Sequence, residues 1–263
     1  MKKRSELFSS KRAQVTLFIV VGIVLVAVVV GFYLILSKTG PEISKPSMTE
    51  PENYIEKCAK DAASDAIDIM LPQGGWISPK RFKTYNNNNV AYLCYTNEFY
   101  RTCKMQEPLY IRHLENEITE FITPKVQNCF ESLKSELEDQ HYAVEMGSMN
   151  ITTELAKNTV KMNVERTFAM SKNDEKRRFE KFNAILNSPL YNLAIVGLEI
   201  ANQEAKYCAF EYVGFMIFYP EFNINKKAVG SGLESSKIYT IQDRYTGKQL
   251  NVATRSCAIP AGF

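Results

Sequence analysis

The sequence is poor in the residues from which metal sites and catalytic sites are usually built. It has only two histidines, His113 and His141, and its six cysteines show no C-x-x-C spacing, so a tetrahedral zinc site is not expected. No G-x-S-x-G pentapeptide is present for a hydrolase nucleophile, and no glycine-rich loop carries the lysine of a P-loop. We therefore expect no cofactor, no metal and no catalytic residue, and both histidines are expected to be surface or capping residues.

Long blocks of one charge sign are also absent. The 32 basic and 29 acidic side chains are mixed along the chain and leave a formal net charge of +3. Mixed charge of this kind is typical of an ordinary solvated surface, whereas a nucleic-acid interface needs clustered positive charge. No nucleic-acid partner is expected.

One long apolar run, at residues 15–36, contrasts with this mixed composition. Its sequence is VTLFIVVGIVLVAVVVGFYLIL, without a charge or a proline. About 20 such residues cross a lipid bilayer as a helix, and the basic residues ahead of them favour a cytoplasmic amino terminus. The run predicts a transmembrane helix over 15–36 after a basic leader over 1–14. The predicted localisation is a single-pass protein of the cell membrane with its carboxyl-terminal domain outside.

The residues directly before the run carry a resemblance to a known family. Lys11 and Arg12, then small Ala13 and Gln14, lead into the apolar segment and resemble the class III signal peptides of archaeal type IV pilin-like proteins. The resemblance implies that a prepilin peptidase cuts between Ala13 and Gln14, and that the protein self-associates in a surface filament. Phe18 stands where many pilins carry a glutamate that helps subunits to dock. A signal anchor that is not cleaved stays open as the alternative.

Two features beyond the run extend this resemblance. Single-pass proteins of small-genome archaea are similar in having a cysteine in the first helix and a Gln-Gly-Gly-aromatic turn, which correspond here to Cys58 and to residues 73–76. The resemblance implies no known activity. Trp76, the aromatic residue of that turn, is expected to pack against the core, with a role as a binding anchor as the alternative.

All six cysteines lie beyond the apolar run. An even number of cysteines outside the cytoplasm is typical of disulfides, because no glutathione pool keeps the thiols reduced there. Free thiols are the alternative, and the connectivity is open from the sequence. The expected pairs are Cys58 with Cys129 between helices, Cys94 with Cys103 across a local turn, and Cys208 with Cys257 near the carboxyl end.

The remaining residues predict an α+β class, in which the transmembrane helix is followed by an extracytoplasmic domain of helices and antiparallel strands. A stalk is expected over 37–50 and the domain over 51–263, with a subdivision near residue 140. Apolar residues at helical spacing predict helices over 51–71, 107–121, 124–133, 173–186 and 191–210. Alternating or aromatic segments predict a strand over 90–95, a hairpin or meander within 142–170, a strand or buried turn over 213–218, and a closing hairpin within 238–256. The polar residues 80–89 are expected to form a loop.

Few polar residues qualify as sites. The pairs Asp61 with Asp65 and Glu115 with Glu117 fit a solvated helix face better than acid–base chemistry. Asn150-Ile151-Thr152 is a sequon for glycosylation at Asn150.

The predicted function is therefore that of a non-enzymatic, membrane-anchored cell-surface protein, as a subunit of a surface filament or adhesion structure. The lipid bilayer, a prepilin peptidase, further copies of the chain and other surface proteins are its expected partners. Two alternatives stay open, an anchored extracellular hydrolase and a ligand-binding module.

Overall fold

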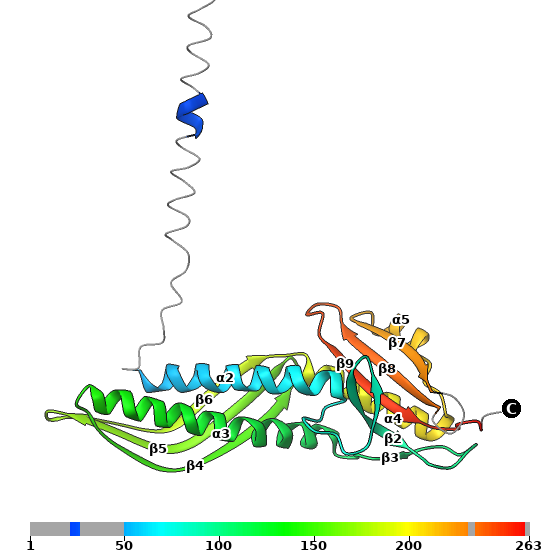
Figure 1. The fold of residues 1–263 in the computed structure, drawn as a ribbon, viewed down its shortest axis with the longest axis horizontal. Helices are drawn as coiled ribbons and strands as arrows, with labels where there is room; N and C mark the ends of the chain where they lie inside the picture. The colour runs from blue at the N-terminus through cyan, green and yellow to red at the C-terminus, as the bar shows by residue number, and fades with distance from the viewer. Residues whose placement is uncertain (1–21, 27–49, 231–234, 261–263) are drawn as a thin grey trace, which may run out of the picture. The chain divides into compact units, whose positions relative to one another are not determined.

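The computed structural model describes residues 22–26, 50–230 and 235–260. The chain divides into two units, Met1–Lys45 and Pro46–Phe263. In the first unit, residues 22–26 are helical. The second unit is a mixed α+β fold that contains two separate β-sheets (Figure 1).

The transmembrane part of the predicted fold class needs correction. Within the ranges that the structure describes, no helix combines the length and the apolar character needed to cross a bilayer. Residues 22–26 of the expected span are helical, and its other residues, like Ala13 and Gln14, lie outside the described ranges. The single-pass localisation depended on that helix, so it is corrected together with it.

Two long helices cover one face of the smaller sheet. Helix α2 lies over β6 and helix α3 over β4, and the sheet has the antiparallel order β4-β5-β6 (Figure 1). Buried aromatic rings fill the space between the layers, with the Phe130 ring 5.0 Å from the Phe182 ring and 6.0 Å from the Phe168 ring. The elements are α2 (Pro51–Met70), α3 (Tyr110–Asp139), β4 (Ala143–Ala156), β5 (Thr159–Lys172) and β6 (Glu175–Asn187).

Helix α3 runs through Pro124, although the sequence predicted one helix ending near Phe121 and another starting at Pro124. A proline inside a helix costs about 3 kcal/mol, because it removes a hydrogen bond and crowds the preceding turn. The apolar stripe of α3 is nevertheless fully buried on both sides of the proline, at Ile118, Ile122 and Val126. Burial of that continuous stripe outweighs the local cost.

Strand β6 replaces the helix that was predicted over 173–186. Asn173, at φ 48°, turns the chain directly back onto β5, and Lys172 pairs with Glu175. Buried Phe182 and Ala184 then alternate with exposed residues, which is the period of a strand with one covered face. The apolar residues of this segment therefore follow the period of a strand and not that of a helix.

The larger sheet has the order β1-β2-β9-β8-β7, with the short β3 on β2. Strands β2 and β9 are parallel, contrary to the expected all-antiparallel arrangement. Helix α4 packs on one face at Gly197, where an added Cβ would come within 3.3 Å of Val252 Cγ2. The elements are η1 (Leu71–Gln73), β1 (Phe82–Tyr85), β2 (Asn88–Tyr95), β3 (Lys104–Met105), α4 (Leu190–Tyr207), α5 (Tyr212–Phe218), β7 (Phe222–Val229), β8 (Ser236–Asp243) and β9 (Gln249–Arg255).

Two segments in or next to the larger sheet differ from the sequence predictions. Residues 80–89, expected to be a loop, contain β1 and the start of β2, because Asn86 and Asn87 adopt φ 47° and 63° and close a two-residue hairpin. Residues 213–218, expected to be a strand or a buried turn, belong to helix α5, which has no buried residue. Its carboxylate cap, Glu211, accepts hydrogen bonds from the amides of Val213 and Gly214.

Three disulfides join Cys58 to Cys129, Cys94 to Cys103 and Cys208 to Cys257. These are the pairs expected from the sequence. The first ties α2 to α3, the second closes the β2–β3 connection, and the third ties the end of α4 to the residues after β9. Disulfides of this number are typical of proteins that fold in oxidising surroundings.

Candidate functional site

Three adjoining hollows open around one side chain, Arg81. Their volumes are about 420, 430 and 520 Å³, and Arg81 lines each of them. The surrounding surface combines cations with aromatic rings, and we call it the basic–aromatic surface. Its residues are Trp76, Arg81, Lys83, Tyr92, Tyr95, Lys104 and Arg255.

The β1–β2 hairpin positions Arg81. Its carbonyl accepts a hydrogen bond of 3.1 Å from the amide of Tyr92, which ties the residue before β1 to the middle of β2. Its guanidinium donates to Gln106 Oε1 at 2.9 Å and lies 5.0 Å from the centre of the Tyr95 ring. No carboxylate in the described part of the chain pairs with Arg81, so an exposed cation with several unused N–H donors stands at the centre of the surface.

Tyr92 and Tyr95 form an aromatic pair beside Arg81. Their ring centres are 4.9 Å apart in an edge-to-face arrangement. The Tyr92 hydroxyl lies 2.6 Å from Ser236 Oγ, and burial raises the pKa of Tyr92 above its ordinary value. Tyr92 therefore keeps its proton at physiological pH, and the two rings offer apolar surface beside Arg81.

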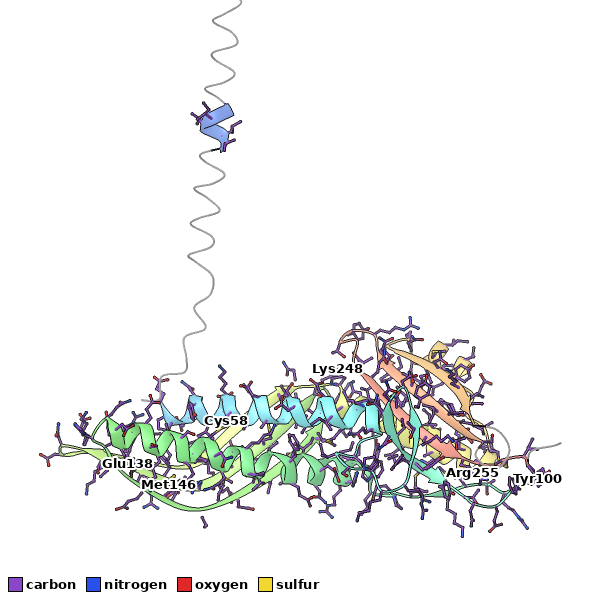
Figure 2. All side chains as sticks on the ribbon, in the orientation of Figure 1. Cys58, Tyr100, Glu138, Met146, Lys248 and Arg255 are labelled. Carbon is purple, nitrogen blue, oxygen red and sulfur yellow. A yellow bond between two sulfur atoms is a disulfide. The ribbon has the colours of Figure 1, made fainter. Side chains whose placement is uncertain are left out.

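Arg255 supplies a second, buried cation. Only 4% of its surface is exposed, and its guanidinium donates hydrogen bonds to the carbonyl oxygens of Thr96 and Glu98. It also lies 5.9 Å from the Tyr95 ring centre and 5.4 Å from that of Phe99. In Figure 2, Arg255 lies near the same end of the larger sheet as Tyr100, a residue of the β2–β3 connection. Arg255 therefore fixes the loop after β2, and it brings a second guanidinium group near the Tyr95 ring in addition to that of Arg81.

Trp76 closes the surface on its other side. Its ring centre lies 4.2 Å from that of His113 and 5.8 Å from that of Tyr110. The preceding turn needs glycine, because Gly75 has φ 92° and an added Cβ would come within 2.5 Å of Leu114 and Tyr110. Trp76 is half-buried, so it packs against the core and also lines a hollow.

The charge around Arg81 is mainly positive. Glu98 has a partner in Arg101, at 3.8 Å, and Glu117 accepts a hydrogen bond of 2.7 Å from the amide of Ile77. Glu107 is the third carboxylate that lines the hollows. Five cations line the same hollows, namely Lys80, Arg81, Lys83, Lys104 and Arg255.

Groups for proton transfer or metal binding do not converge here. His113 Nε2 is buried without a hydrogen-bond partner among the described residues, and it lies 4.0 Å from Glu117 Oε1. Ser78 lines the same hollow as Glu117, but the structure gives no hydrogen bond between Ser78 and His113. Across the described ranges, no group of three His, Cys, Asp or Glu side chains could hold a metal ion. The arrangement can bind an anion through guanidinium and ammonium donors and an apolar moiety through ring faces.

The other residues singled out in the sequence lie apart from this surface. Asn150 and Thr152 are exposed on the edge strand β4, so the sequon is accessible. His141 is exposed at φ 67° in the turn before β4. Asp65 pairs with Lys125 at 2.8 Å on the helix layer.

The pair Glu115 and Glu117 differs from the predicted solvated face. Both side chains are half-buried and bind backbone amides of other elements, Glu115 that of Leu155 at 2.9 Å and Glu117 that of Ile77 at 2.7 Å. Their role is to join α3 to β4 and to the turn that carries Trp76.

The central residues of the surface were not predicted from the sequence. Lys80, Arg81 and Lys83, followed by Tyr92 and Tyr95, gave a local signal of cations close to tyrosines. Arg255 gave none, since it is 159 positions from its acceptor Thr96 and joins the surface only through the parallel β2–β9 pairing.

No protein-family model, curated protein or solved structure matches this chain, so the basic–aromatic surface is interpreted from its own geometry.

Proposed function

We propose that the unit Pro46–Phe263 is a non-enzymatic binding module that holds an anionic polymer across the basic–aromatic surface. The observation that carries the proposal is the position of Arg81, an exposed cation shared by three hollows and flanked by tyrosine rings. Guanidinium groups bind carboxylates through paired, charge-assisted hydrogen bonds, and these are stronger than neutral ones.

The shape of the surface supports a polymer over a small molecule. Sites for small ligands are usually enclosed and bury most of the ligand. Here three open hollows adjoin along β1, β2 and β3, which suits an extended chain with repeated charges. We choose carboxylate groups as the charges because guanidinium binds them through two parallel hydrogen bonds, and the tyrosine rings beside Arg81 can contact the apolar faces of an acidic sugar.

Binding of polygalacturonate to the full chain tests the proposal, with neutral dextran as the comparison polymer. We expect binding to polygalacturonate that weakens steeply when the salt concentration rises from about 0.05 to 0.5 M, because salt screens exposed charges. The variant Arg81→Gln keeps most of the side-chain length and removes the charge. It should weaken binding by about tenfold or more, since a hydrogen bond to a charged group contributes about 1.5–3 kcal/mol.

Arg244→Gln is the matched control. Arg244 is exposed and lies in the turn that joins β8 to β9, at the opposite end of β9 from Arg255. Equal losses in the two variants would show nonspecific charge attraction and would contradict the proposal. Equal affinity for single-stranded DNA would contradict the choice of a carboxylate polymer.

The predicted role as a subunit of a surface filament stays a prediction. A binding module and a filament subunit are compatible, since the surface around Arg81 involves only residues of the second unit.

A further inference from the structure

A separate apolar groove lies between α4 and α5. It has a volume of about 720 Å³, with Ile195 and Leu198 on the α4 side and Phe215 and Tyr219 on the α5 side. Helix α4 covers the face of the larger sheet that contains Leu93 and Val252. Tyr92 belongs to an apolar cluster on the other face of this sheet. The groove and the basic–aromatic surface therefore lie on opposite faces of the larger sheet.

Helix α5 forms one wall of the groove, and it also carries exposed apolar side chains that do not line the groove. Ile217 is 74% exposed, Phe218 is 81% exposed and Val213 is 53% exposed. Large apolar side chains that cluster on a surface mark interaction sites more often than those that stand alone.

The rest of α5 is held firmly against the domain. The amide of Ile224 in β7 donates to Met216 Sδ at 3.1 Å, and the Phe215 ring lies 5.3 Å from that of Phe210 and 4.5 Å from that of Tyr219. Ile217 and Phe218 are therefore presented outward by a fixed helix, which lowers the entropy cost of binding through them.

We propose that the groove between α4 and α5 receives α5 of a second copy of this chain, in a two-fold symmetric dimer. An apolar ridge directly beside an apolar groove is self-complementary. In a two-fold contact each copy can place its ridge in the groove of the other.

The area and the charges fit this occupant. A large apolar side chain has a surface of about 150–200 Å². With this value, the exposed apolar surface amounts to roughly 500 Å² per copy and about 1,000 Å² for two copies. The residues included are Ile195, Val213, Ile217, Phe218 and Tyr219. That area, which already includes Ile195 and Tyr219 of the groove lining, meets the minimum of about 1,000 Å² expected for a biological interface. The groove is lined by Lys157 as well as by Glu199 and Glu221, so two copies can bring opposite charges together, which a rim of one sign would prevent.

Sedimentation velocity of the full chain, from about 1 to 100 µM, tests the dimer. We expect a reversible monomer–dimer equilibrium that Phe218→Asp weakens by at least about tenfold. The matched control is Tyr245→Asp, which adds the same charge at an aromatic residue that is 85% exposed in the β8–β9 turn. Monomers at every concentration, or an equal effect of both variants, would overturn the proposal.

Photo-crosslinking identifies the surface directly. Benzoylphenylalanine in place of Phe218, in a mixture of isotopically light and heavy chains, should link a light copy to α4 of a heavy copy. If light chains were linked only to light chains and heavy chains only to heavy chains, the links would lie within one copy, and this would overturn the proposal. Links between copies at positions outside the α4–α5 groove would also overturn it. Polygalacturonate binding by Phe218→Asp should equal that of the unchanged chain at protein concentrations below the dimer dissociation constant, so this test fails or succeeds independently of the function proposed above.

Discussion

The ammonium group of Lys237 lies 2.7 Å from Oε2 of Glu204, whose side chain is fully buried. Lys237 also donates to the carbonyl of Cys208, and the hydroxyl of Tyr239 donates to Glu204. These bonds tie the end of α4 to β8, next to the disulfide between Cys208 and Cys257.

Lys237→Met should therefore destabilise the domain strongly. The change leaves the Glu204 carboxylate buried without its cation, and breaking a buried pair in this way costs about 3–5 kcal/mol. Urea unfolding measures the loss. The matched comparison is Lys248→Met. Lys248 pairs with Asp68, and both side chains are about half exposed. An exposed salt bridge of this kind contributes about 0–1 kcal/mol to the free energy of unfolding. Similar losses in the two variants would contradict a special role for the buried pair.

Stability should fall at alkaline pH. Burial raises the pKa of Tyr110 well above its ordinary value, and burial with the neighbouring Glu204 does the same for the pKa of Tyr239. The folded state thus holds these protons more tightly than the unfolded chain, in which tyrosine titrates near about 10. Their full stabilisation is present below that pH and is lost as the pH rises above it, by up to about 1.4 kcal/mol per pH unit for each tyrosine.

Urea unfolding between about pH 8 and 11.5 measures this loss. Tyr110→Phe is less stable at neutral pH, because the hydroxyl donates a 2.8 Å hydrogen bond to the Gly74 carbonyl, but its pH profile should be flatter. A constant free energy of unfolding through pH 11 in the unchanged chain would contradict the prediction.

Removing the disulfide between the two long helices should cost about 4 kcal/mol. The bond joins residues 71 positions apart, so the double variant Cys58→Ala with Cys129→Ala gives the unfolded chain a large increase in conformational entropy. The expected result is a lower urea midpoint with unchanged secondary structure by circular dichroism. An unchanged midpoint would show that the helix layer is held by packing alone.

Asn150 should be glycosylated when the chain is produced in a secretory host that glycosylates asparagine. Its side chain and that of Thr152 are both exposed on the edge strand β4, where nothing described covers them. Intact mass should show the added sugar, and Thr152→Val should abolish it. Because β4 belongs to the smaller sheet, sugar at Asn150 should leave polymer binding around Arg81 unchanged.

The fold was predictable where local pattern and tertiary packing agree. Helix α2 begins at Pro51 as expected, and the β4–β5 hairpin follows the alternation of apolar residues that was seen in the sequence. Strand β6 was missed because its charged start and spaced phenylalanines also match a helix, and only its pairing with β5 decides between the two.

The candidate site was predictable only in part for a similar reason. Arg81 and Tyr92 are close in sequence, and their shared hairpin depends on two asparagines that tolerate positive φ. Arg255 reaches the surface because β9 pairs in parallel with β2, a strand far from it in the sequence. No pattern near Arg255 in the sequence predicts this pairing.

Helix α2 has a mechanical consequence. Its 20 residues, at about 1.5 Å each, separate Pro51 from the Trp76 turn by about 30 Å. A pull between a ligand held at Arg81 and the residues that precede Pro51 would be carried through α2. The Cys58–Cys129 bond, less than three turns from Pro51, would transfer part of that load to α3, so two helices rather than one would resist being pulled apart.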